Sequence, residues 1–248
     1  MRVQLLSFFD ESPRVRRFRW RYTAEGEAFY QQVEQFRAYA GISSEEPIFQ
    51  PGQFVQLRHE AIFPEGRSYS LCHWLEAAQP EFELCIVLNE KGKATPWLFE
   101  QEVGLELECT PPQGRFVLEN DPEGMPLVFI ATGTGLAPLM PMMETALKQG
   151  GHSVYLFAGH RWAEDELFQK ELQHWQNQYP AFTYFACGSR EPIQGRQCYV
   201  HACYEPFLKK WPQARFYACG WKAMLSDCRS ILKSAGYSRR DYRMEAYD

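Results

Sequence analysis

The fold of this 248-residue chain is decided by the stretch Leu127-Val128-Phe129-Ile130-Ala131-Thr132-Gly133-Thr134-Gly135-Leu136-Ala137-Pro138. Its first half is a continuous apolar run, which is typical of a strand buried on both faces. A glycine turn follows and enters a helical pattern, so its backbone amides are expected at a helix N-terminus, where a pyrophosphate can bind. The turn differs from the dinucleotide motif G-x-G-x-x-G because its last position is Pro138. The residues predicted to bind phosphate here are Thr132, Gly133, Thr134, Gly135 and Pro138.

The rest of the C-terminal half alternates short apolar runs with helical patterns. Buried strands that alternate with helices predict a parallel sheet covered on both faces. The predicted strands are Pro126–Ala131, Ser153–Phe157, Phe182–Ala186 and Arg215–Ala218, and the predicted helices are Leu136–Gln149, Glu164–Tyr179 and Lys222–Ala235.

The N-terminal half has six short β-rich runs separated by turn residues, which predict a small antiparallel barrel. The runs are Val3–Phe9, Arg14–Tyr22, Gln53–Arg58, Arg67–Cys72, Phe82–Leu88 and Leu105–Cys109. Between them, Glu25–Tyr39 has apolar residues at helical spacing and is predicted to be a helical insertion. We therefore expect two domains: an antiparallel β-barrel over residues 1–120 and an α/β parallel-sheet nucleotide-binding domain over residues 121–248.

Composition excludes several classes of protein. A net charge of -5 argues against nucleic-acid binding, and no run approaches the roughly 18 apolar residues that cross a bilayer. The apolar stretch Val3–Phe9 is short and reads as a strand, not a signal peptide. The eight cysteines show no C-x-x-C pair, so we expect reduced thiols and no metal site. Cys198 and Cys203 begin an iron–sulfur spacing, but Pro206 stands where the third cysteine belongs.

Arg67-Ser68-Tyr69-Ser70 lies in a predicted strand, so Arg67 and Tyr69 share one face. An arginine offers a bidentate fork for phosphate, and a tyrosine offers a flat ring that can stack on a flavin. Ser70 can hydrogen-bond the N5 edge of that flavin. The alternative is an ordinary barrel strand with an exposed arginine and a packed tyrosine.

A second candidate phosphate segment consists of Gly92, Lys93, Ala94 and Thr95. It reads as a glycine loop entering a short helix, with Thr95 near the N-cap and Pro96 at the first helical position. Free amides at a helix start bind phosphate. A plain capped turn is the alternative.

Two segments in the C-terminal half follow predicted strands. Ser189 and Arg190, with Arg196 and Tyr199 shortly after, can hold a 2′-phosphate and stack on adenine. A solvated loop is the alternative. Cys219-Gly220 ends a strand at the carboxyl edge of the sheet, where a small side chain can pack against nicotinamide. The alternative is a buried structural cysteine.

Together these segments resemble the plant-type ferredoxin–NADP⁺ reductase superfamily over nearly the whole chain, with Pro51-Gly52-Gln53-Phe54 as the usual lead-in. The resemblance implies that Arg67, Tyr69 and Ser70 bind the flavin phosphate, ring and N5 edge. It implies that Gly92–Thr95 is the second flavin-phosphate segment. The preference for FAD over FMN rests on this resemblance alone.

The same resemblance implies NADP(H) as co-substrate. The turn Gly133–Pro138 is similar to the family's pyrophosphate loop, and Ser189-Arg190 with Tyr199 resembles its NADP-selecting segment. In the tail, Glu245 would assist proton and hydride traffic and Tyr247 would cover the flavin. The chain departs from the family pattern in having Gln197 where a lysine is expected and in extending to Asp248 beyond the aromatic.

The leading hypothesis is a flavoenzyme that transfers hydride between NADP(H) and FAD and passes electrons singly to or from a ferredoxin or flavodoxin. Its predicted catalytic residues are Ser70, Cys219, Glu245 and Tyr247. A free-flavin reductase and the reductase component of an oxygenase are alternatives within the superfamily. A redox-inert nucleotide-binding sensor is the alternative from another class. We expect a cytoplasmic monomer.

Residues 14–21 contain five arginines among eight positions. In a strand, Arg17, Arg19 and Arg21 would share one face while Phe18 and Trp20 point to the core. This basic stripe is either a docking surface for an acidic carrier protein or a solvated outer face balanced by neighbouring carboxylates.

Overall fold

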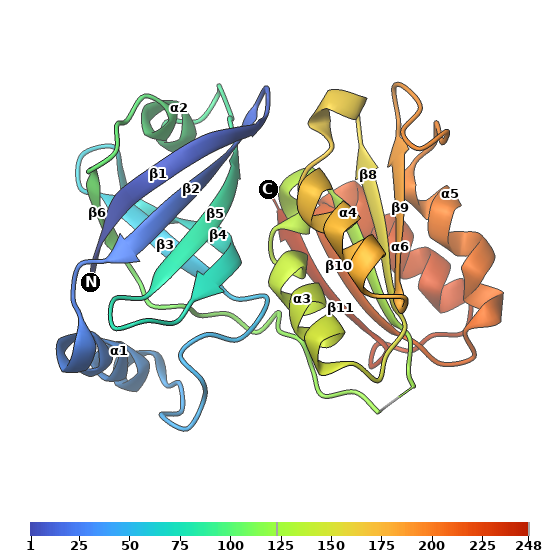
Figure 1. Ribbon diagram of the computed structural model, residues 1–248, viewed down its shortest axis with the longest axis horizontal. Coiled ribbons are helices and arrows are strands. Elements are labelled where there is room, and N and C mark those ends of the chain that lie inside the picture. Colours follow the sequence, from blue (N-terminus) through green and yellow to red (C-terminus); the bar gives the residue numbers. More distant parts are fainter. Residues whose placement is uncertain (123, 248) are drawn as a thin grey trace. The chain divides into compact units, whose positions relative to one another are not determined.

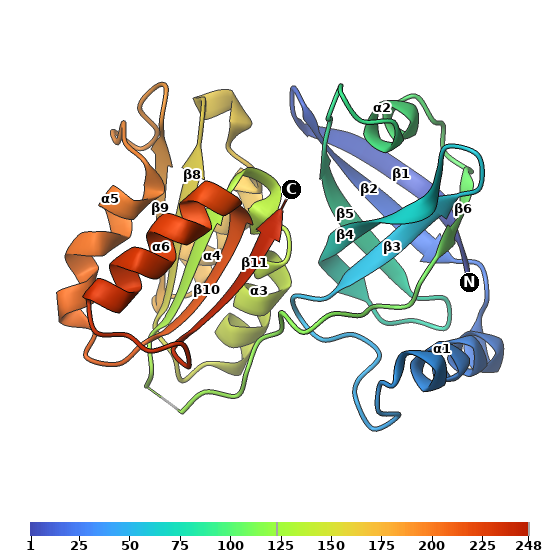
Figure 2. The same cartoon turned by 180° about the vertical axis from the view of Figure 1, so that it is seen from behind.

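The computed structural model describes residues 1–122 and 124–247, and the chain divides into two compact units, Met1–Val117 and Leu118–Asp248 (Figures 1 and 2). The first unit is a closed antiparallel barrel, and the second is a parallel sheet with helices on both faces. The predicted fold class is therefore confirmed. Asp248, which was expected to extend the chain beyond the terminal aromatic, lies outside the described residues.

Six strands close the barrel in the order β1-β2-β5-β4-β3-β6. Side-chain alternation decides what points inward: in β2, Phe18, Trp20 and Tyr22 are fully buried, and the arginines between them lie on the opposite face. Each of the six predicted runs forms a strand. Their bounds are β1 (Arg2–Ser12), β2 (Val15–Tyr22), β3 (Phe54–His59), β4 (Phe63–Leu75), β5 (Glu81–Val87) and β6 (Glu106–Cys109).

The predicted helical insertion is present as α1 (Gly26–Ala40). It buries Phe29 and Val33 in the hydrophobic core of the barrel, and Arg37 donates hydrogen bonds to backbone carbonyls in the segment that follows. The helix ends at Gly41, whose φ of 69° is a left-handed conformation that suits glycine. The insertion is therefore part of the folded barrel unit.

The short helix α2 (Ala94–Phe99) has Lys93 as its N-cap, and Thr95, predicted near the N-cap, is the second residue of the helix. The Thr95 hydroxyl accepts a hydrogen bond from the Asn89 amide at 2.9 Å and donates one to the Asn89 carbonyl at 3.3 Å. Because its hydroxyl is used in this way, Thr95 holds the preceding turn. Pro96 accordingly lies inside the helix and not at its first position.

The second unit contains five parallel strands in the order β11-β10-β7-β8-β9. The central strand β7 buries five successive apolar residues, as its continuous apolar run predicts. The edge strand β11 was not predicted, because Arg243 and Glu245 interrupt its apolar pattern. The bounds are β7 (Leu127–Thr132), β8 (Val154–His160), β9 (Phe182–Gly188), β10 (Arg215–Trp221) and β11 (Tyr242–Tyr247).

Helices α3 (Leu139–Gln149) and α4 (Gln169–Gln178) cover one face of this sheet, and α5 (Val200–Tyr204) and α6 (Lys222–Ser234) cover the other (Figures 1 and 2). Helix α3 begins later than predicted because the 3₁₀ turn η1 (Gly133–Leu136) precedes it. None of the described helices is long and apolar enough to cross a bilayer.

The prediction that α4 begins at Glu164 is wrong, because the helix begins only at Gln169. Phe168, just before it, has φ of 56° and is 1% exposed. A right-handed helix cannot continue through a left-handed residue, and burial of the ring holds Phe168 in that conformation.

The arginine stripe of β2 faces carboxylates on β5. Arg17 contacts Glu83 at 2.5 Å, and Arg19 and Arg21 contact the two oxygens of Glu81 at 2.6 and 2.8 Å. Much of the positive charge is therefore neutralised within the barrel surface. The structure favours the solvated outer face over the docking surface.

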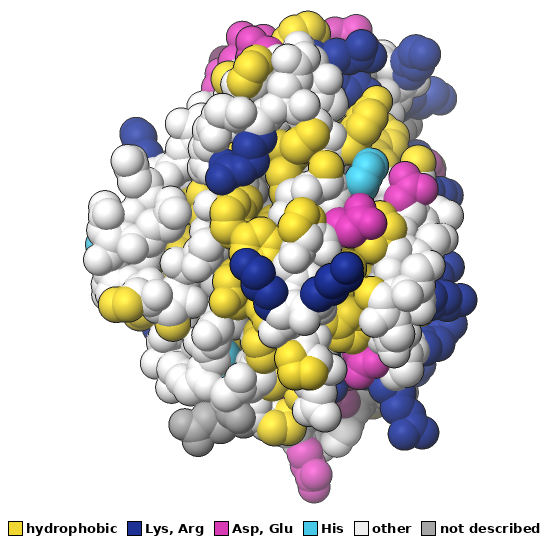
Figure 3. Space-filling model, turned by 90° about the vertical axis from the view of Figure 1, so that its right-hand side faces the viewer, with side chains coloured by type: hydrophobic (Ala, Val, Ile, Leu, Met, Phe, Trp, Pro, Cys, Tyr) yellow, Lys and Arg dark blue, Asp and Glu magenta, His cyan; other side chains and the backbone are white. Residues whose placement is uncertain are grey.

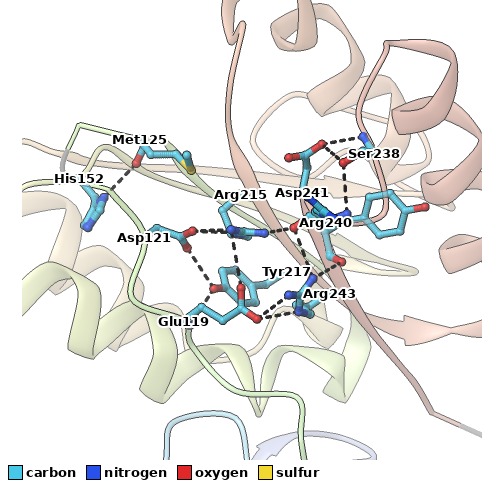
Figure 4. Close-up of polar contacts among 11 residues, drawn as sticks. Glu119, Asp121, Met125, His152, Arg215, Tyr217, Ser238, Arg240, Asp241 and Arg243 are labelled. Atoms are coloured by element: carbon cyan, nitrogen blue, oxygen red, sulfur yellow. Dashed lines mark hydrogen bonds and ion pairs between the residues drawn. The ribbon is translucent and has the colours of Figure 1, made fainter.

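A polar network ties the segment before β7 to the starts of β10 and β11 (Figure 4). Arg215 donates to Asp121 Oδ1 at 2.8 Å, and Arg243 donates to Glu119 Oε1 at 2.8 Å. The hydroxyl of Tyr217 accepts a hydrogen bond from the Glu119 amide at 3.0 Å. The Asp121 side chain is only 2% exposed, so its charge depends on Arg215 for compensation.

Replacing Asp121 with alanine is expected to lower the free energy of unfolding of the second unit by about 1 to 3 kcal/mol, because the largely buried guanidinium of Arg215 loses its shortest ion pair and keeps the 3.7 Å pair with Glu119. Urea unfolding followed by tryptophan fluorescence measures this loss. The control is Glu106→Ala on the barrel, where Glu106 and its partner Arg2 are 43% and 66% exposed and the expected change is below about 1 kcal/mol. Equal losses in both variants would contradict the anchoring role of Asp121.

Candidate functional site

The order in which strands are added to the parallel sheet reverses between β7 and β10, although all five strands run in the same direction. From β7 it proceeds through β8 to β9, then returns to the other side of β7 to form β10 and ends in β11. The carboxyl ends of β7 and β10 therefore flank a topological switch point, where open parallel sheets bind ligands. The predicted phosphate turn and the Cys219-Gly220 pair both lie at this point.

The turn η1 and the end of β10 approach so closely that their contact requires glycine. A Cβ atom on Gly135 would lie 2.3 Å from the carbonyl oxygen of Cys219, and one on Gly220 would lie 2.1 Å from Thr132 Oγ1. Gly133 differs, because no heavy atom lies within 4 Å of the position of its missing Cβ and its φ is 53°. The turn thus packs on β10 through Gly135 and leaves open space beside Gly133.

The remaining turn residues lead into helix α3. The carbonyl of Thr134 accepts a hydrogen bond from the Ala137 amide at 2.9 Å, which closes the 3₁₀ turn. Pro138 is buried and directly precedes the first residue of α3. The structure therefore places the predicted phosphate-binding residues together at the entrance to a helix.

The C-terminal segment lies beside β10 as strand β11. Its parallel register places Glu245 opposite Cys219 and Ala246 opposite Gly220. Cys219 is fully buried, and burial raises the pKa of its thiol; the charge of Glu245 adds to the effect, and a hydrogen bond with Tyr247 opposes it. The structure thus brings together three of the four predicted catalytic residues, all within the second unit.

The segment after β9 carries the residues predicted to select the coenzyme. The Ser189 amide donates to the carbonyl of His160 at 2.9 Å, and the Arg190 amide donates to the carbonyl of Arg161 at 3.0 Å. The two segments that follow β8 and β9 therefore remain paired beyond the ends of these strands. The Arg190 side chain is exposed at this carboxyl edge.

Arg196 and Tyr199 lie farther along the same segment. Tyr199 is 69% exposed and stacks its ring on His201, with centroids 6.0 Å apart. The guanidinium of Arg196 lies over the ring of Phe185 at 5.0 Å. Gln197, at the position of the expected lysine, donates to the Arg190 carbonyl at 3.2 Å.

His160, at the end of β8, is a site residue that sequence reasoning missed. Its side chain is 7% exposed, and neither ring nitrogen forms a well-aligned hydrogen bond among the described residues, although the backbone of Asp165 is near enough to raise the pKa of the ring in part. Burial lowers its pKa to about 4, so the ring is neutral at pH 7. A single histidine at a strand end has no spacing that could have signalled this position.

In the barrel, strand β4 carries Arg67 and Tyr69 on one face and Ser70 on the other, as predicted. Arg67 is 45% exposed and forms an ion pair with Glu65. Tyr69 packs against the barrel core, and burial raises its pKa to about 12, an effect that the charge of Arg67 reduces. Ser70 is buried, at 5% exposure.

Lys93 lies near the same corner of the barrel. The pKa of Glu65 is lowered by a backbone hydrogen bond, by the hydrogen bond from Arg67 and, more weakly, by the charge of Lys93. The Gly92 amide is already used, since it donates to the Asn89 carbonyl at 2.9 Å. Phosphate contacts from this segment are therefore left to Lys93 and the residues after it.

Each unit thus has one corner suited to a phosphate-bearing ligand. The barrel corner combines exposed cations with a partly buried tyrosine ring, a donor set that fits a phosphate joined to a planar ring system. The switch point of the second unit combines open backbone beside Gly133 with the entrance to α3, which fits a second phosphate group.

Comparison with known proteins places this architecture among flavin and nicotinamide enzymes. Residues 129–230 match the family described as oxidoreductase NAD-binding domain. Ferredoxin–NADP reductase B of Sorangium cellulosum is 28% identical over 215 residues, covering 81% of this chain and 86% of that protein. The reductase component of phenol 2-monooxygenase from Pseudomonas sp. is 31% identical over 208 residues, covering 80% of this chain and 58% of that protein.

Solved structures share the fold over almost the entire chain. The Amycolatopsis cytochrome P450 reductase GcoB superimposes with a TM-score of 0.79 at 25% identity, covering 99% of this chain and 69% of that one. A ferredoxin NADP⁺ reductase of Neisseria gonorrhoeae, solved with bound FAD and NADP, superimposes with a TM-score of 0.76 at 18% identity. The match covers 99% of this chain and 98% of that one. The chain spans 54 to 60% of the length of six of the relatives that match its sequence.

Replacing His160 with glutamine is expected to reduce the loss of stability on acidification. The folded pKa of about 4 lies below the unfolded value of about 6.5, so in this range the unfolded chain binds a proton that the folded chain does not. The stability from the neutral ring is fully present above pH 6.5 and falls by about 3 kcal/mol as the pH drops to 4. Urea unfolding across this pH range measures the slope.

The control for this measurement is His174→Gln, which changes an exposed histidine of α4 and should keep the wild-type slope. A wild-type slope in His160→Gln would contradict the neutral, buried state of His160.

Proposed function

The chain belongs to the plant-type ferredoxin–NADP⁺ reductase superfamily, and we propose that it transfers hydride between NADP(H) and FAD and passes single electrons to or from a small carrier protein. The family predicted from the sequence motifs is thereby confirmed. The observation that carries the proposal is the contact of Gly135 with Cys219 at the switch point, because it joins the phosphate turn to the residues proposed for hydride transfer.

The barrel is proposed to hold FAD, and the donor set at its corner supports this assignment. Bound FAD supplies the conversion between two-electron and one-electron transfer. Arg67 would bind a phosphate through its exposed guanidinium, Tyr69 would provide the ring for stacking, and Ser70 would provide a polar group for N5. Lys93 and the start of α2 would bind the second phosphate.

Replacing Arg67 with alanine is expected to weaken flavin retention by about tenfold to a hundredfold, because a charge-assisted phosphate contact contributes roughly 1.5 to 3 kcal/mol. Flavin content after dialysis measures retention. Arg58→Ala is the matched control, since Arg58 is an exposed arginine on the neighbouring strand β3 with only a weak 3.7 Å pair to Glu108. Flavin content that is equal in the two variants would refute the role of Arg67.

The second unit is proposed to bind NADP(H) at its carboxyl edge. The amides around Gly133 would contact the pyrophosphate, and Ser189 and Arg190 would contact the 2′-phosphate. Tyr199 is exposed and available to stack on adenine. Arg196 packs over the ring of Phe185, which engages its guanidinium. We therefore propose that Arg190 has the main role in selecting NADPH over NADH.

Cys219, Glu245 and Tyr247 are proposed to act on the hydride side. Cys219 offers a small, protonated thiol against nicotinamide, and Glu245 offers a carboxylate one strand away. Tyr247 is proposed as an aromatic cover for the flavin ring that gives way to nicotinamide. Slower flavin reduction in Glu245→Ala, with flavin still bound, is the expected sign of that carboxylate's role.

The function is tested by anaerobic addition of NADPH to the flavin-loaded protein, which should bleach the flavin absorbance faster than NADH does. In Gly135→Ala the new methyl group would overlap the Cys219 carbonyl, so the turn must move. We expect flavin to stay bound and the NADPH concentration for half-maximal bleaching to rise about tenfold to a hundredfold.

Gly150→Ala is the control for backbone strain alone, since Gly150 has φ of 73° with no heavy atom near its missing Cβ. It should leave NADPH-driven bleaching unchanged. No bleaching of the wild-type protein by NADPH would refute the proposal in favour of a redox-inert sensor.

A second candidate is the reductase component of an oxygenase, which is favoured by the similarity to the phenol 2-monooxygenase component. Both candidates retain bound flavin, so loss of all flavin on gel filtration would point instead to a free-flavin reductase. Stopped-flow electron transfer to a ferredoxin or flavodoxin tests the first candidate, for which we propose rapid transfer to such a carrier.

A further inference from the structure

Three cysteines of the second unit converge although the chain separates them. Cys187 lies near the end of β9, Cys198 precedes α5, and Cys203 lies within α5. Their sulfur atoms all lie within 4.8 Å of one another, and those of Cys198 and Cys203 are 3.5 Å apart. No other group of three or more potential metal ligands occurs among the described residues.

Backbone pairing beyond β9 builds this cluster. The Gly188 amide donates to the Arg196 carbonyl at 3.1 Å, and the Cys198 amide donates back to the Gly188 carbonyl at 3.0 Å. The intervening turn is therefore closed on itself, which returns Cys198 to the strand end beside Cys187. Helix α5 starts immediately afterwards and adds Cys203 from its own side.

The three sulfurs are spaced as metal ligands. A zinc–sulfur bond of about 2.3 Å implies sulfurs about 3.8 Å apart in tetrahedral geometry. The observed separations, 3.5 Å for one pair and no more than 4.8 Å for any, bracket this value, so small side-chain rotations would complete the site. Soft thiolate ligands select zinc and related thiophilic ions over hard cations.

We propose that Cys187, Cys198 and Cys203 bind one thiophilic d¹⁰ cation such as Zn²⁺. Binding would release the thiol protons to solvent and form three metal–sulfur bonds. The fourth position would be taken by water, which can enter beside the partly exposed Cys198.

The surroundings suit the resulting charge. Three thiolates and a divalent cation carry one net negative charge, and the guanidinium of Arg196 acts electrostatically on both Cys198 and Cys203. The face of the molecule drawn in Figure 3 carries Lys and Arg side chains on and beside a band of hydrophobic side chains, together with a few Asp and Glu side chains. Cys187 and Cys203 belong to the hydrophobic core cluster of the second unit and Cys198 packs against it, so apolar neighbours shield the site, while Arg196 compensates its charge.

The test is a titration of the reduced, full-length protein with Cd²⁺, which reports thiolate binding through its ultraviolet charge-transfer band, followed by competition with Zn²⁺. One equivalent of Cd²⁺ is expected to bind and to be displaced by Zn²⁺. Cys198→Ser and Cys203→Ser should each weaken Cd²⁺ binding by at least about tenfold, because loss of a ligand costs no less than loss of a group that supports one. Circular dichroism checks that each variant is folded.

Cys228→Ser is the matched control, since Cys228 is a fully buried thiol of the same unit outside the cluster, and it should bind Cd²⁺ as the wild type does. Wild-type Cd²⁺ affinity in Cys198→Ser and Cys203→Ser would overturn the proposal. So would a reduced protein that binds no Cd²⁺ and, on exposure to peroxide, joins Cys198 to Cys203 as a disulfide. Cd²⁺ binding and disulfide formation are both measured without flavin or NADPH. A failure of this proposal can therefore be distinguished from a failure of the proposed function.

Discussion

The contact between the turn after β7 and the end of β10 is the constraint on which the second unit depends. Gly135 lies against the Cys219 backbone where a methyl group would overlap it, and Gly220 lies against Thr132 in the same way. These approaches close the sheet at its switch point and hold η1 at the entrance to α3. The ligand edge of the sheet therefore follows from backbone packing, and any larger residue at Gly135 would move the phosphate turn and β10 apart.

Charge is distributed differently over the two units. At the switch point the buried groups are held neutral, since burial lowers the pKa of His160 and raises that of Cys219. An anionic ligand there meets backbone amides and the exposed Arg190, while the half-buried carboxylate of Glu245 lies one strand away beside Cys219. In the barrel, Arg67 and Lys93 are accessible cations that already act on Glu65. A phosphate group would compete with that carboxylate for Arg67.

The predicted strands of both units are present because period-two alternation and continuous apolar runs are local properties of the chain. The errors arise where tertiary contacts outweigh local pattern. Helix α4 starts late because buried Phe168 adopts a left-handed conformation, and Pro96 is not the first residue of α2 because that helix already begins at Ala94. The sequence pattern did not predict strand β11, because an edge strand can carry charged residues and still pair through its backbone.

The sequence by itself determined the two-unit fold, the glycine turn and the candidate residues of each phosphate corner, since each depends on residues close together in the chain. Only the tertiary structure decided which of the candidate residues lie close together in space. The parallel register placed Glu245 beside Cys219, burial made His160 neutral, and the closed turn after β9 gathered Cys187, Cys198 and Cys203. The physical reason is that side chains distant in sequence become neighbours only when strands pair and helices pack, and no local spacing encodes that approach.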